Sequence, residues 1–301
     1  MDLYQRSIAI RANIPETHNN LSAALRLAGR PLDAEAAAQQ ALRLDRNYGE
    51  AENNLGLALC DLKRYPEAIH CFECALQIDG ENVESLNNLG VALDAAGKVD
   101  KARETFVQAL ALQPENIDAK LNLGNLYRKT GQLTDAAQQY SEALELNPGD
   151  LRAYANLGLT LINKNQPEGA IALYEKALAL APETPDIQMS LGIAQLMLGN
   201  FEDGWRNYEA RWQAISFTAK RRSFAGTPWT GQPLAGKSIL VYAEQGFGDT
   251  IQFARYLPLI AGQADKVVFE CQKALMQLCS NLVGVTQLVA RGEPLPETDY
   301  H

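Results

Sequence analysis

The sequence predicts a mainly α-helical protein, in which pairs of helices stack into a solenoid, followed by a short α/β unit. The main observation is a set of Asn-Leu pairs that recur at a step of 34 residues. The asparagines are Asn20, Asn54, Asn88, Asn122 and Asn156. This step is the length of one helix-turn-helix repeat, so the period predicts the architecture. A second observation predicts the α/β unit: after residue 236, short apolar runs alternate with helical segments.

Composition and charge narrow the class of protein. The 301 residues are 47% hydrophobic and 21% charged, as in a soluble folded chain. No apolar run is long enough for a membrane helix and the first residues lack a signal-peptide pattern, so we expect a cytoplasmic protein without membrane insertion.

The charge is unevenly distributed along the chain. Residues 219–301 contain eight Lys/Arg and seven Asp/Glu, which leaves 19 and 29 of the totals of 27 and 36 for residues 1–218. Such an acidic surface repels phosphate backbones, so nucleic acid is not an expected partner. The acidic charge either keeps the repeats soluble or attracts basic peptides.

The cysteines do not form a recognisable site. They are Cys60, Cys71, Cys74, Cys271 and Cys279. An odd number without a secretory signal argues against a disulfide framework. Cys71 and Cys74 form a CxxC within a helical pattern, but only His70 lies beside it and a tetrahedral metal site needs a fourth ligand. The sequence therefore predicts no metal site.

The period divides residues 15–218 into six units. With Leu-Gly as positions 7 and 8, they are 15–48, 49–82, 83–116, 117–150, 151–184 and 185–218. Small residues at positions 8, 20 and 27 let two antiparallel helices approach closely, and bulkier residues at positions 7, 24 and 28 fill the space between units. Residues 1–14 fit the second helix of a truncated earlier unit. Because a solenoid normally begins with a cap, this start suggests a piece of a longer protein.

These positions resemble the tetratricopeptide repeat over about two-thirds of the chain. The resemblance implies a right-handed superhelix whose first helices line a concave groove. Position 6, where the five asparagines stand, lies on those helices, and a carboxamide can pair with the N–H and C=O groups of a peptide backbone. We therefore expect a protein or an extended peptide in the groove. The line of asparagines also resembles the ladder in the repeat domain of eukaryotic O-GlcNAc transferase.

Two alternatives remain for the asparagines: scaffold filler, or hydrogen bonds between repeats. Asn19, Asn53 and Asn87 at position 5 extend the polar strip, whereas Leu121 and Ala155 replace them later.

The sixth unit departs from the pattern. Ser190 replaces the asparagine, and Trp205 and Trp212 enter the second helix. Large aromatic residues at the end of a solenoid are expected to seal it against a neighbouring domain, with an aromatic ligand platform as the alternative. Residues 219–236, which begin with a short basic run, are predicted to form a linker broken by glycine and proline.

The α/β unit is predicted at residues 237–301. Its expected strands are Ser238–Ala243, Lys266–Cys271 and Val285–Val289, and its expected helices are Thr250–Ala261 and Gln272–Asn281. Gly246 and Gly248 lie in the loop after the first strand, where α/β folds place ligands.

The string from Trp229 to Tyr256 resembles bacterial proteins that join tetratricopeptide repeats to a glycosyltransferase-like domain. Its turn resembles that of heptosyltransferase-type enzymes, which have two Rossmann-like halves. The resemblance implies that Asp249 deprotonates the acceptor hydroxyl, with Glu244 and Arg255 as supports. The alternative is that Asp249 caps the following helix.

The resemblance also implies a nucleotide-sugar donor for the complete parent protein, bound by a second half that is missing from this chain. We therefore expect the chain alone to hold no cofactor and to be inactive, and whether it belongs to an enzyme stays open. The alternatives are a non-enzymatic scaffold with an α/β docking tail, and a repeat protein that senses a small molecule at the junction.

Overall fold

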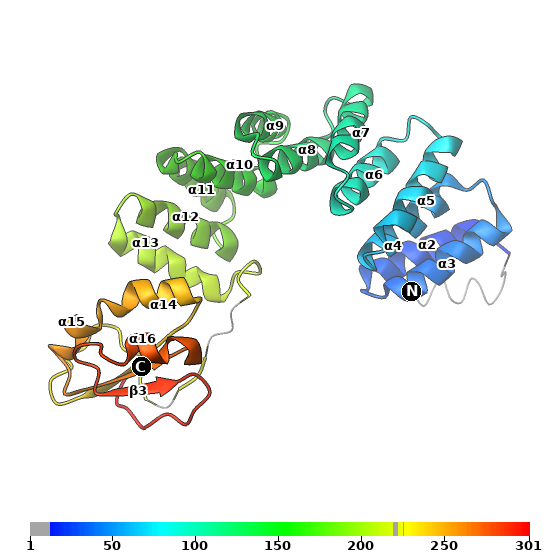
Figure 1. Cartoon of the computed structure of the whole chain (residues 1–301). Helices are drawn as coiled ribbons and strands as arrows, with labels where there is room; N and C mark the ends of the chain where they lie inside the picture. The colour runs from blue at the N-terminus through cyan, green and yellow to red at the C-terminus, as the bar shows by residue number, and fades with distance from the viewer. Residues whose placement is uncertain (1–12, 219–221, 225) are drawn as a thin grey trace. The chain divides into compact units, whose positions relative to one another are not determined.

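In the computed structural model the chain forms two compact units, Met1–Arg211 and Trp212–His301 (Figure 1). The structure describes residues 13–218, 222–224 and 226–301. The helix expected within residues 1–14 thus falls almost wholly outside the described residues. The first unit ends before the expected repeat boundary at residue 218, because the last helix stops at Tyr208 and a 3₁₀ turn, Glu209–Trp212, follows.

The first unit is a solenoid of helix pairs. The first helices of the pairs are α2 (Pro15–Leu27), α4 (Gly49–Asp61), α6 (Val83–Ala95), α8 (Ile117–Lys129), α10 (Leu151–Asn163) and α12 (Pro185–Met197). The second helices are α3 (Pro31–Leu44), α5 (Tyr65–Ile78), α7 (Val99–Leu112), α9 (Leu133–Leu146), α11 (Pro167–Leu180) and α13 (Phe201–Tyr208). Each first helix begins at the first residue of its predicted unit, so the 34-residue period is the period of the fold.

Glycine at position 8 allows the two helices of a pair to touch, as predicted. A β-carbon at Gly124 would lie 2.6 Å from the ring of Tyr140, and one at Gly158 would lie 2.4 Å from the ring of Tyr174. Both aromatic side chains are fully buried. Close packing of this kind leaves no room for a larger residue at position 8 of the second to sixth repeats, whereas the first repeat has Ser22 there.

The two helices of each pair are joined by a residue in the left-handed region, always at position 15. Four of the six are glycines: Gly29, Gly97, Gly131 and Gly199. The other two are Lys63, with φ of 60°, and Asn165, with φ of 56°. This conformation ends the first helix and reverses the chain into the second.

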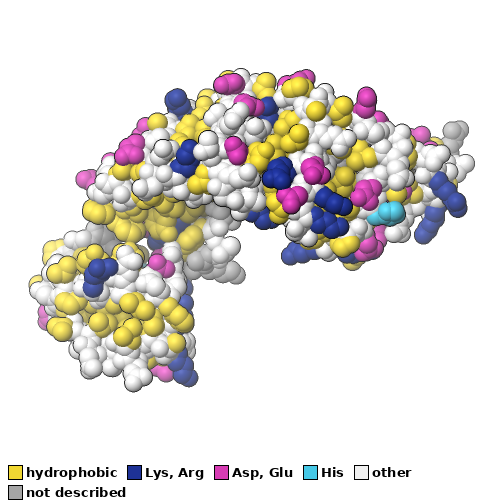
Figure 2. All heavy atoms as spheres, turned by 45° about the horizontal axis from the view of Figure 1, so that its top comes forward, with side chains coloured by type: hydrophobic (Ala, Val, Ile, Leu, Met, Phe, Trp, Pro, Cys, Tyr) yellow, Lys and Arg dark blue, Asp and Glu magenta, His cyan; other side chains and the backbone are white. Residues whose placement is uncertain are grey.

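The first helices form a continuous wall. Each packs on its own second helix and also directly on the first helix of the next repeat, whereas direct contacts between consecutive second helices are weaker. The residues of the first helices at positions 2, 5, 6 and 9 therefore lie on one face, which we call the inner wall. Figure 2 shows acidic and basic side chains interspersed with apolar patches on another view of the molecule.

The second unit contains a small parallel sheet. Its strands are β1 (Ser238–Tyr242), β2 (Lys266–Cys271) and β3 (Gln287–Ala290), in the order β1-β2-β3. Leu240 pairs with Val268, and Val268 pairs with Gln287. A parallel three-stranded sheet is shared by many α/β folds, so the Rossmann-like assignment stays a prediction.

Two helices of the second unit differ from the prediction. The helix expected at Thr250–Ala261 is split into α14 (Phe247–Ala254) and α15 (Leu257–Ala261). Pro258 causes the split, because it has no N–H to donate to the carbonyl four residues earlier. The helix expected at Gln272–Asn281 is a 3₁₀ turn, Lys273–Leu275, followed by a single turn, α16 (Met276–Cys279).

Part of the expected linker belongs to the sheet. Tyr300 makes parallel bridges with Ile239 on one side and Thr227 on the other. The N–H of Leu240 donates to the Tyr300 carbonyl at 2.9 Å, and the N–H of Trp229 donates to the His301 carbonyl at 2.8 Å. Residues 227–229 of the expected linker therefore pair with residues 299–301, which cover the β1 edge, and the linker over residues 219–236 stays a prediction.

Candidate peptide-binding face of the repeats

The five asparagines at position 6 all lie on the inner wall. Asn20 is exposed, and the other four are half-buried. Half-burial fixes a side chain while leaving part of it accessible, which suits a group that contacts a partner.

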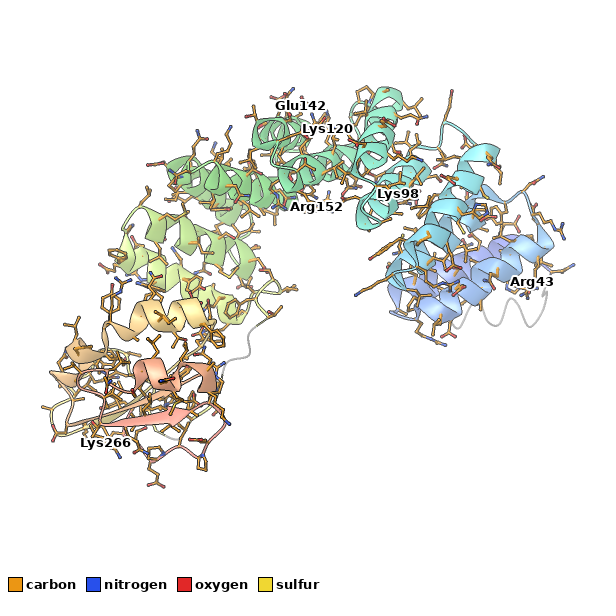
Figure 3. All side chains as sticks on the ribbon, viewed as in Figure 1. Arg43, Lys98, Lys120, Glu142, Arg152 and Lys266 are labelled. Carbon is orange, nitrogen blue, oxygen red and sulfur yellow. The ribbon has the colours of Figure 1, made fainter. Side chains whose placement is uncertain are left out.

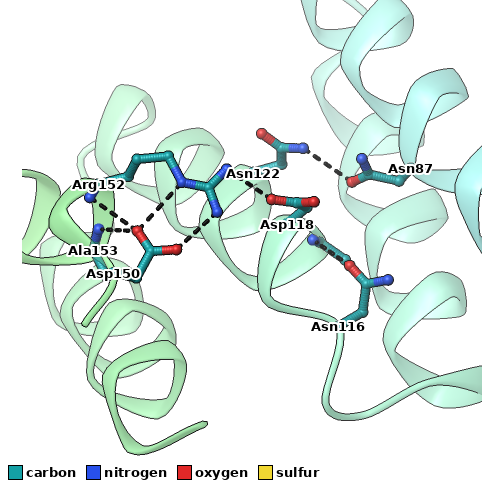
Figure 4. A network of polar contacts seen from close by, with 8 residues as sticks. Asn87, Asn116, Asp118, Asn122, Asp150, Arg152 and Ala153 are labelled. Carbon is teal, nitrogen blue, oxygen red and sulfur yellow. Dashed lines mark hydrogen bonds and ion pairs between the residues drawn. The ribbon is translucent and has the colours of Figure 1, made fainter. Parts of the chain in front are cut away.

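Three of these asparagines are tied to the preceding repeat. The Nδ2 of Asn122 donates to the Oδ1 of Asn87 at 2.9 Å (Figure 4). The same bond joins Asn88 to Asn53 at 3.0 Å and Asn54 to Asn19 at 2.7 Å. The alternative of hydrogen bonding between repeats is therefore what the contacts show for Asn54, Asn88 and Asn122.

The asparagines at position 5 have a second partner. The Nδ2 of Asn53 donates to Glu84 Oε1 at 3.2 Å, and the Nδ2 of Asn19 donates to the Tyr48 hydroxyl at 3.2 Å and to Glu50 Oε2 at 3.5 Å. Asn19 and Asn53 thus direct the amide oxygen to position 6 of the next repeat and the amide nitrogen to the carboxylate at position 2 of that repeat. Asn19 and Asn53 are buried, so these bonds satisfy polar groups that have little access to water.

The ties stop where position 5 becomes apolar. Leu121 occupies this position in the fourth repeat and is 4% exposed. Asn156 consequently has no amide to donate to, and its carboxamide makes no hydrogen bond within the described residues. The spacing of 35 residues between Asn87 and Asn122 was the sequence signal for a tie, and the prediction did not use it.

Position 2 is acidic in every repeat except the fifth. It is occupied by Glu16, Glu50, Glu84, Asp118, Arg152 and Asp186. The guanidinium of Arg152 pairs with Asp118 at 2.8 Å and with Asp150 at 2.7 Å (Figure 4). The hydrogen bond from Arg152 is the main cause that holds the pKa of Asp150 below its usual value, and the backbone N–H groups of Arg152 and Ala153 add to it.

Apolar side chains at position 9 share the inner wall. Val91 is 42% exposed, Leu159 40% and Ile193 38%. Single exposed apolar residues are common on protein surfaces, but here they recur at one position in the third, fifth and sixth repeats. The wall therefore offers amide, carboxylate and apolar groups in parallel rows.

A hollow on the repeats is lined by an ion pair. It has a volume of about 340 Å³ and is lined by Pro114, Glu115, Lys120, Glu142, Glu145 and Leu146. Lys120 is buried, and its Nζ donates to Glu142 Oε2 at 2.5 Å (Figure 3). This pair also lowers the pKa of Glu142.

The cysteines are free thiols, of which Cys71, Cys271 and Cys279 are buried and Cys60 and Cys74 are half-buried. Burial raises the pKa of Cys71 to about 12 and that of Cys60 to about 11. A thiol with such a pKa is a poor nucleophile and a poor metal ligand at neutral pH. Among the described residues, no group of three or more histidine, cysteine and acidic side chains is placed to hold a metal ion.

Asp249 lies at the start of α14 and caps it. It is exposed, and its Oδ2 accepts the N–H of Gly246 at 3.2 Å. Arg255 is turned back onto its own helix, where its Nε donates to the Gln252 carbonyl at 2.7 Å. Glu244 is half-buried, and Gly248 borders open space. The contacts agree with the capping alternative, and a catalytic role for Asp249 stays a prediction.

Sequence reasoning missed a buried ion pair in the second unit. Glu270 on β2 is 1% exposed, and both its oxygens accept from the guanidinium of Arg222, with Nη2 to Oε1 at 2.9 Å. The guanidinium also lies over the rings of Phe224 and Tyr242. The basic run that contains Arg222 gave no sign of this partner, because Glu270 lies inside an apolar strand.

The tryptophans of the sixth repeat have local partners. Trp205 contacts Tyr208 edge-on, with ring centroids 5.9 Å apart, and Trp212 contacts Phe217 at 5.6 Å. Their expected role in sealing the solenoid against a domain stays a prediction.

Within the described part of the chain, every helix is too short or too polar to cross a bilayer.

Comparison with known proteins places the repeats in a family. Models described as "Tetratricopeptide repeat" match residues 47–115, 87–150 and 140–172, and one described as "TPR repeat" matches residues 160–199. Among curated proteins, the chain is similar to Protein FlbA of Caulobacter vibrioides, with 38% identity over 72 residues. The match covers 24% of this chain and only 12% of FlbA.

Solved structures show the same fold. The chain is similar to pilF of Pseudomonas aeruginosa, with a TM-score of 0.57 and 20% identity, over 66% of this chain and 89% of that one. It is also similar to PilW, described as a type IV pilus biogenesis factor, with a TM-score of 0.60 and 23% identity, over 66% and 91%. At these identities the likeness concerns the fold alone.

Proposed function

The chain is a tetratricopeptide repeat protein, and from this premise we propose that its inner wall binds an extended segment of a partner protein. The observation that carries the proposal is Asn156. Its half-buried carboxamide stands in the row of position-6 amides, yet it makes no hydrogen bond within the described residues. A fixed amide with free donor and acceptor can pair with a peptide bond of a partner.

The neighbouring residues support contact with a peptide backbone and an apolar side chain. Leu159, three residues along the same helix, is 40% exposed. Residues three apart on a helix lie side by side. The Asn156 amide would hold the backbone, and Leu159 would pack against an apolar side chain of the same segment. Such a pair combines affinity with limited sequence preference.

Asn156→Ala tests the proposal. The probe is a set of fluorescein-labelled, unstructured 12-mer peptides of mixed composition, with binding followed by fluorescence anisotropy. Loss of one net hydrogen bond of about 1 kcal/mol should weaken the binding peptides roughly fivefold. The melting temperature should not change, because no intramolecular bond is lost.

Gln108→Ala is the matched control, because it removes an exposed amide from the second helix α7. It should bind like the wild type. Equal affinities for the wild type, the Asn156 variant and the control would contradict the proposal.

A second candidate is recruitment of acceptor substrates for an attached glycosyltransferase-like domain. It is favoured by the sheet, in which residues 299–301 flank β1 on the side opposite β2. This arrangement sets the turn at Gly246–Asp249 at the carboxyl end of a strand with parallel neighbours on both sides, a position where α/β folds bind ligands.

Incubation of the chain with its peptide ligands and a mixture of uridine-diphosphate sugars, followed by mass spectrometry, tests whether its α/β unit transfers a sugar without the second half that the resemblance implies. A sugar transferred by the wild type and not by Asp249→Asn, which keeps an oxygen for the cap, would support catalysis and overturn the expectation that the chain alone is inactive. Unmodified peptides in every reaction would contradict catalysis by this chain and leave the binding function standing.

A further inference from the structure

Resting on the proposed function, we infer that the inner wall of the first three repeats selects partner segments rich in lysine and arginine. The inference concerns two rows on this wall: the position-6 amides and the position-2 carboxylates. The structure shows that both rows present hydrogen-bond acceptors to a partner and that neither is balanced by a cation.

The position-6 amides are oriented by their ties. Asn54 and Asn88 each donate an N–H back to the amide of the preceding repeat. In a carboxamide the oxygen lies on the other side of the carbon from the nitrogen, so this bond turns the oxygen away from the preceding repeat. Figure 4 shows the same orientation for Asn122. Neither oxygen accepts a hydrogen bond within the described residues. The tie thus uses one of the two N–H donors of each amide and leaves its oxygen free to accept a hydrogen bond from a partner.

The carboxylates at position 2 stand beside these oxygens. Glu16, Glu50 and Glu84 are exposed, and none forms an ion pair within the described residues. Glu50 and Glu84 accept amide N–H groups from position 5, which fixes their direction without removing their charge. Their place in the first turn also suits the helix dipole, and that role is compatible with binding.

Cations are missing from positions 2, 5, 6 and 9 of the first three repeats. In the first three repeats, position 5 is asparagine and position 9 is alanine, leucine or valine. A partner therefore meets three carboxylates and a row of amide oxygens with no basic residue at these positions. Lysine offers three donors and arginine five, and neither can accept. A basic segment can donate hydrogen bonds to the acceptors of the inner wall, whereas an acidic segment would place its own acceptors opposite them.

The wall changes along its length, which gives the bound segment a direction. In the fifth repeat, Arg152 replaces the acid at position 2 and pairs with Asp118. Leu121 and Ala155 replace the asparagines at position 5 of the fourth and fifth repeats, and Leu159 and Ile193 are exposed at position 9 of the last two. The segment should therefore be basic where it crosses the first three repeats and apolar where it crosses the last two.

Three labelled peptides of equal length test the inference, each carrying lysine, glutamine or glutamate at the same alternate positions. Exposed charge pairs each contribute modestly, so three together should favour the lysine peptide over the glutamine peptide about 10-fold at low salt. The preference should shrink as salt screens the pairs. The glutamate peptide should bind most weakly.

The variant Glu16→Gln/Glu50→Gln/Glu84→Gln removes the charges and keeps an acceptor oxygen at each site. It should bring the lysine and glutamine peptides to within about twofold of each other, which leaves a difference in binding free energy of about 0.4 kcal/mol. The matched control is Glu104→Gln/Glu145→Gln/Glu175→Gln, which removes three exposed charges from second helices. It should keep the preference.

Equal binding of the three peptides to the wild type would overturn the inference while leaving the proposed function intact. An equal loss of preference in both triple variants would also overturn it, because the attraction would then follow net charge and not the inner wall. Failure of every peptide to bind the wild type would overturn the inference and the proposed function together.

Discussion

Lys63 is the residue whose replacement should stabilise the solenoid. It occupies position 15 with φ of 60°, where four of the other five repeats have glycine. A residue with a β-carbon in this conformation costs roughly 1–2 kcal/mol. Glycine removes that strain but adds roughly 0.5–1 kcal/mol of chain entropy to the unfolded state. Lys63→Gly should therefore raise the free energy of unfolding by about 0.5–1 kcal/mol.

The side chain of Lys63 is exposed and makes no hydrogen bond or ion pair within the described residues, so its loss should cost little. Urea unfolding followed by far-UV circular dichroism measures the change. Lys63→Ala, which keeps the strain, should show no comparable gain. Gly97→Ala should lower the free energy of unfolding. The added β-carbon would meet nothing within 4 Å, so the whole effect comes from placing a residue with a β-carbon at φ of 76°. A stability gain in Lys63→Ala equal to that in Lys63→Gly would refute the reasoning.

Three further predictions concern packing and charge. Gly192→Ala should destabilise by about 3 kcal/mol and Gly124→Ala by about 1–2 kcal/mol in urea unfolding, because the first β-carbon meets backbone and the second a movable ring. Asp150→Asn should make the free energy of unfolding less dependent on pH under acidic conditions. Because the pKa of Asp150 is lowered in the folded state, its stabilisation is present above about pH 4 and is lost as the pH falls through the folded-state pKa. Acid titration followed by circular dichroism measures this loss. Arg222→Met should destabilise the second unit by roughly 2–4 kcal/mol, because it leaves the carboxylate of Glu270 buried and unpaired, and differential scanning calorimetry should show its transition at a lower temperature.

Periodicity made the repeats predictable. The glycines at position 8 and the aromatic residues at position 24 repeat at one spacing, and the structure brings them into contact in the second to fifth repeats. The turn at position 15 escaped prediction because Lys63 and Asn165 interrupt the row of glycines that would have marked it. The spacing of residues along the sequence predicts which face of a helix is buried, but it does not predict which residue adopts a strained backbone conformation.

Contacts between distant residues were the part that the sequence could not supply. The pairing of Thr227 with Tyr300 has no local signature, because the two segments meet only in the folded sheet. The amide ties depend on the direction of the side chains. From the sequence, Asn53 and Asn88 are two polar residues that could each face the groove, and only the fold shows that Asn88 donates to Asn53. Asp249 could be considered as a cap from the sequence because its place near the start of a helix is a local feature; in the structure it lies in the first turn of α14 and accepts the N–H of Gly246.

Leu121 has a consequence for how such a protein changes over generations. Its side chain is buried, so a bound segment would not touch it. Because this side chain is apolar, the carboxamide of Asn156 in the next repeat has no amide to donate to. A single substitution from asparagine to leucine at an interior site can thus alter the recognition properties of a neighbouring unit without touching the residue that makes contact. Substitutions at buried positions of a repeat array can therefore change the binding specificity of the next repeat along the chain.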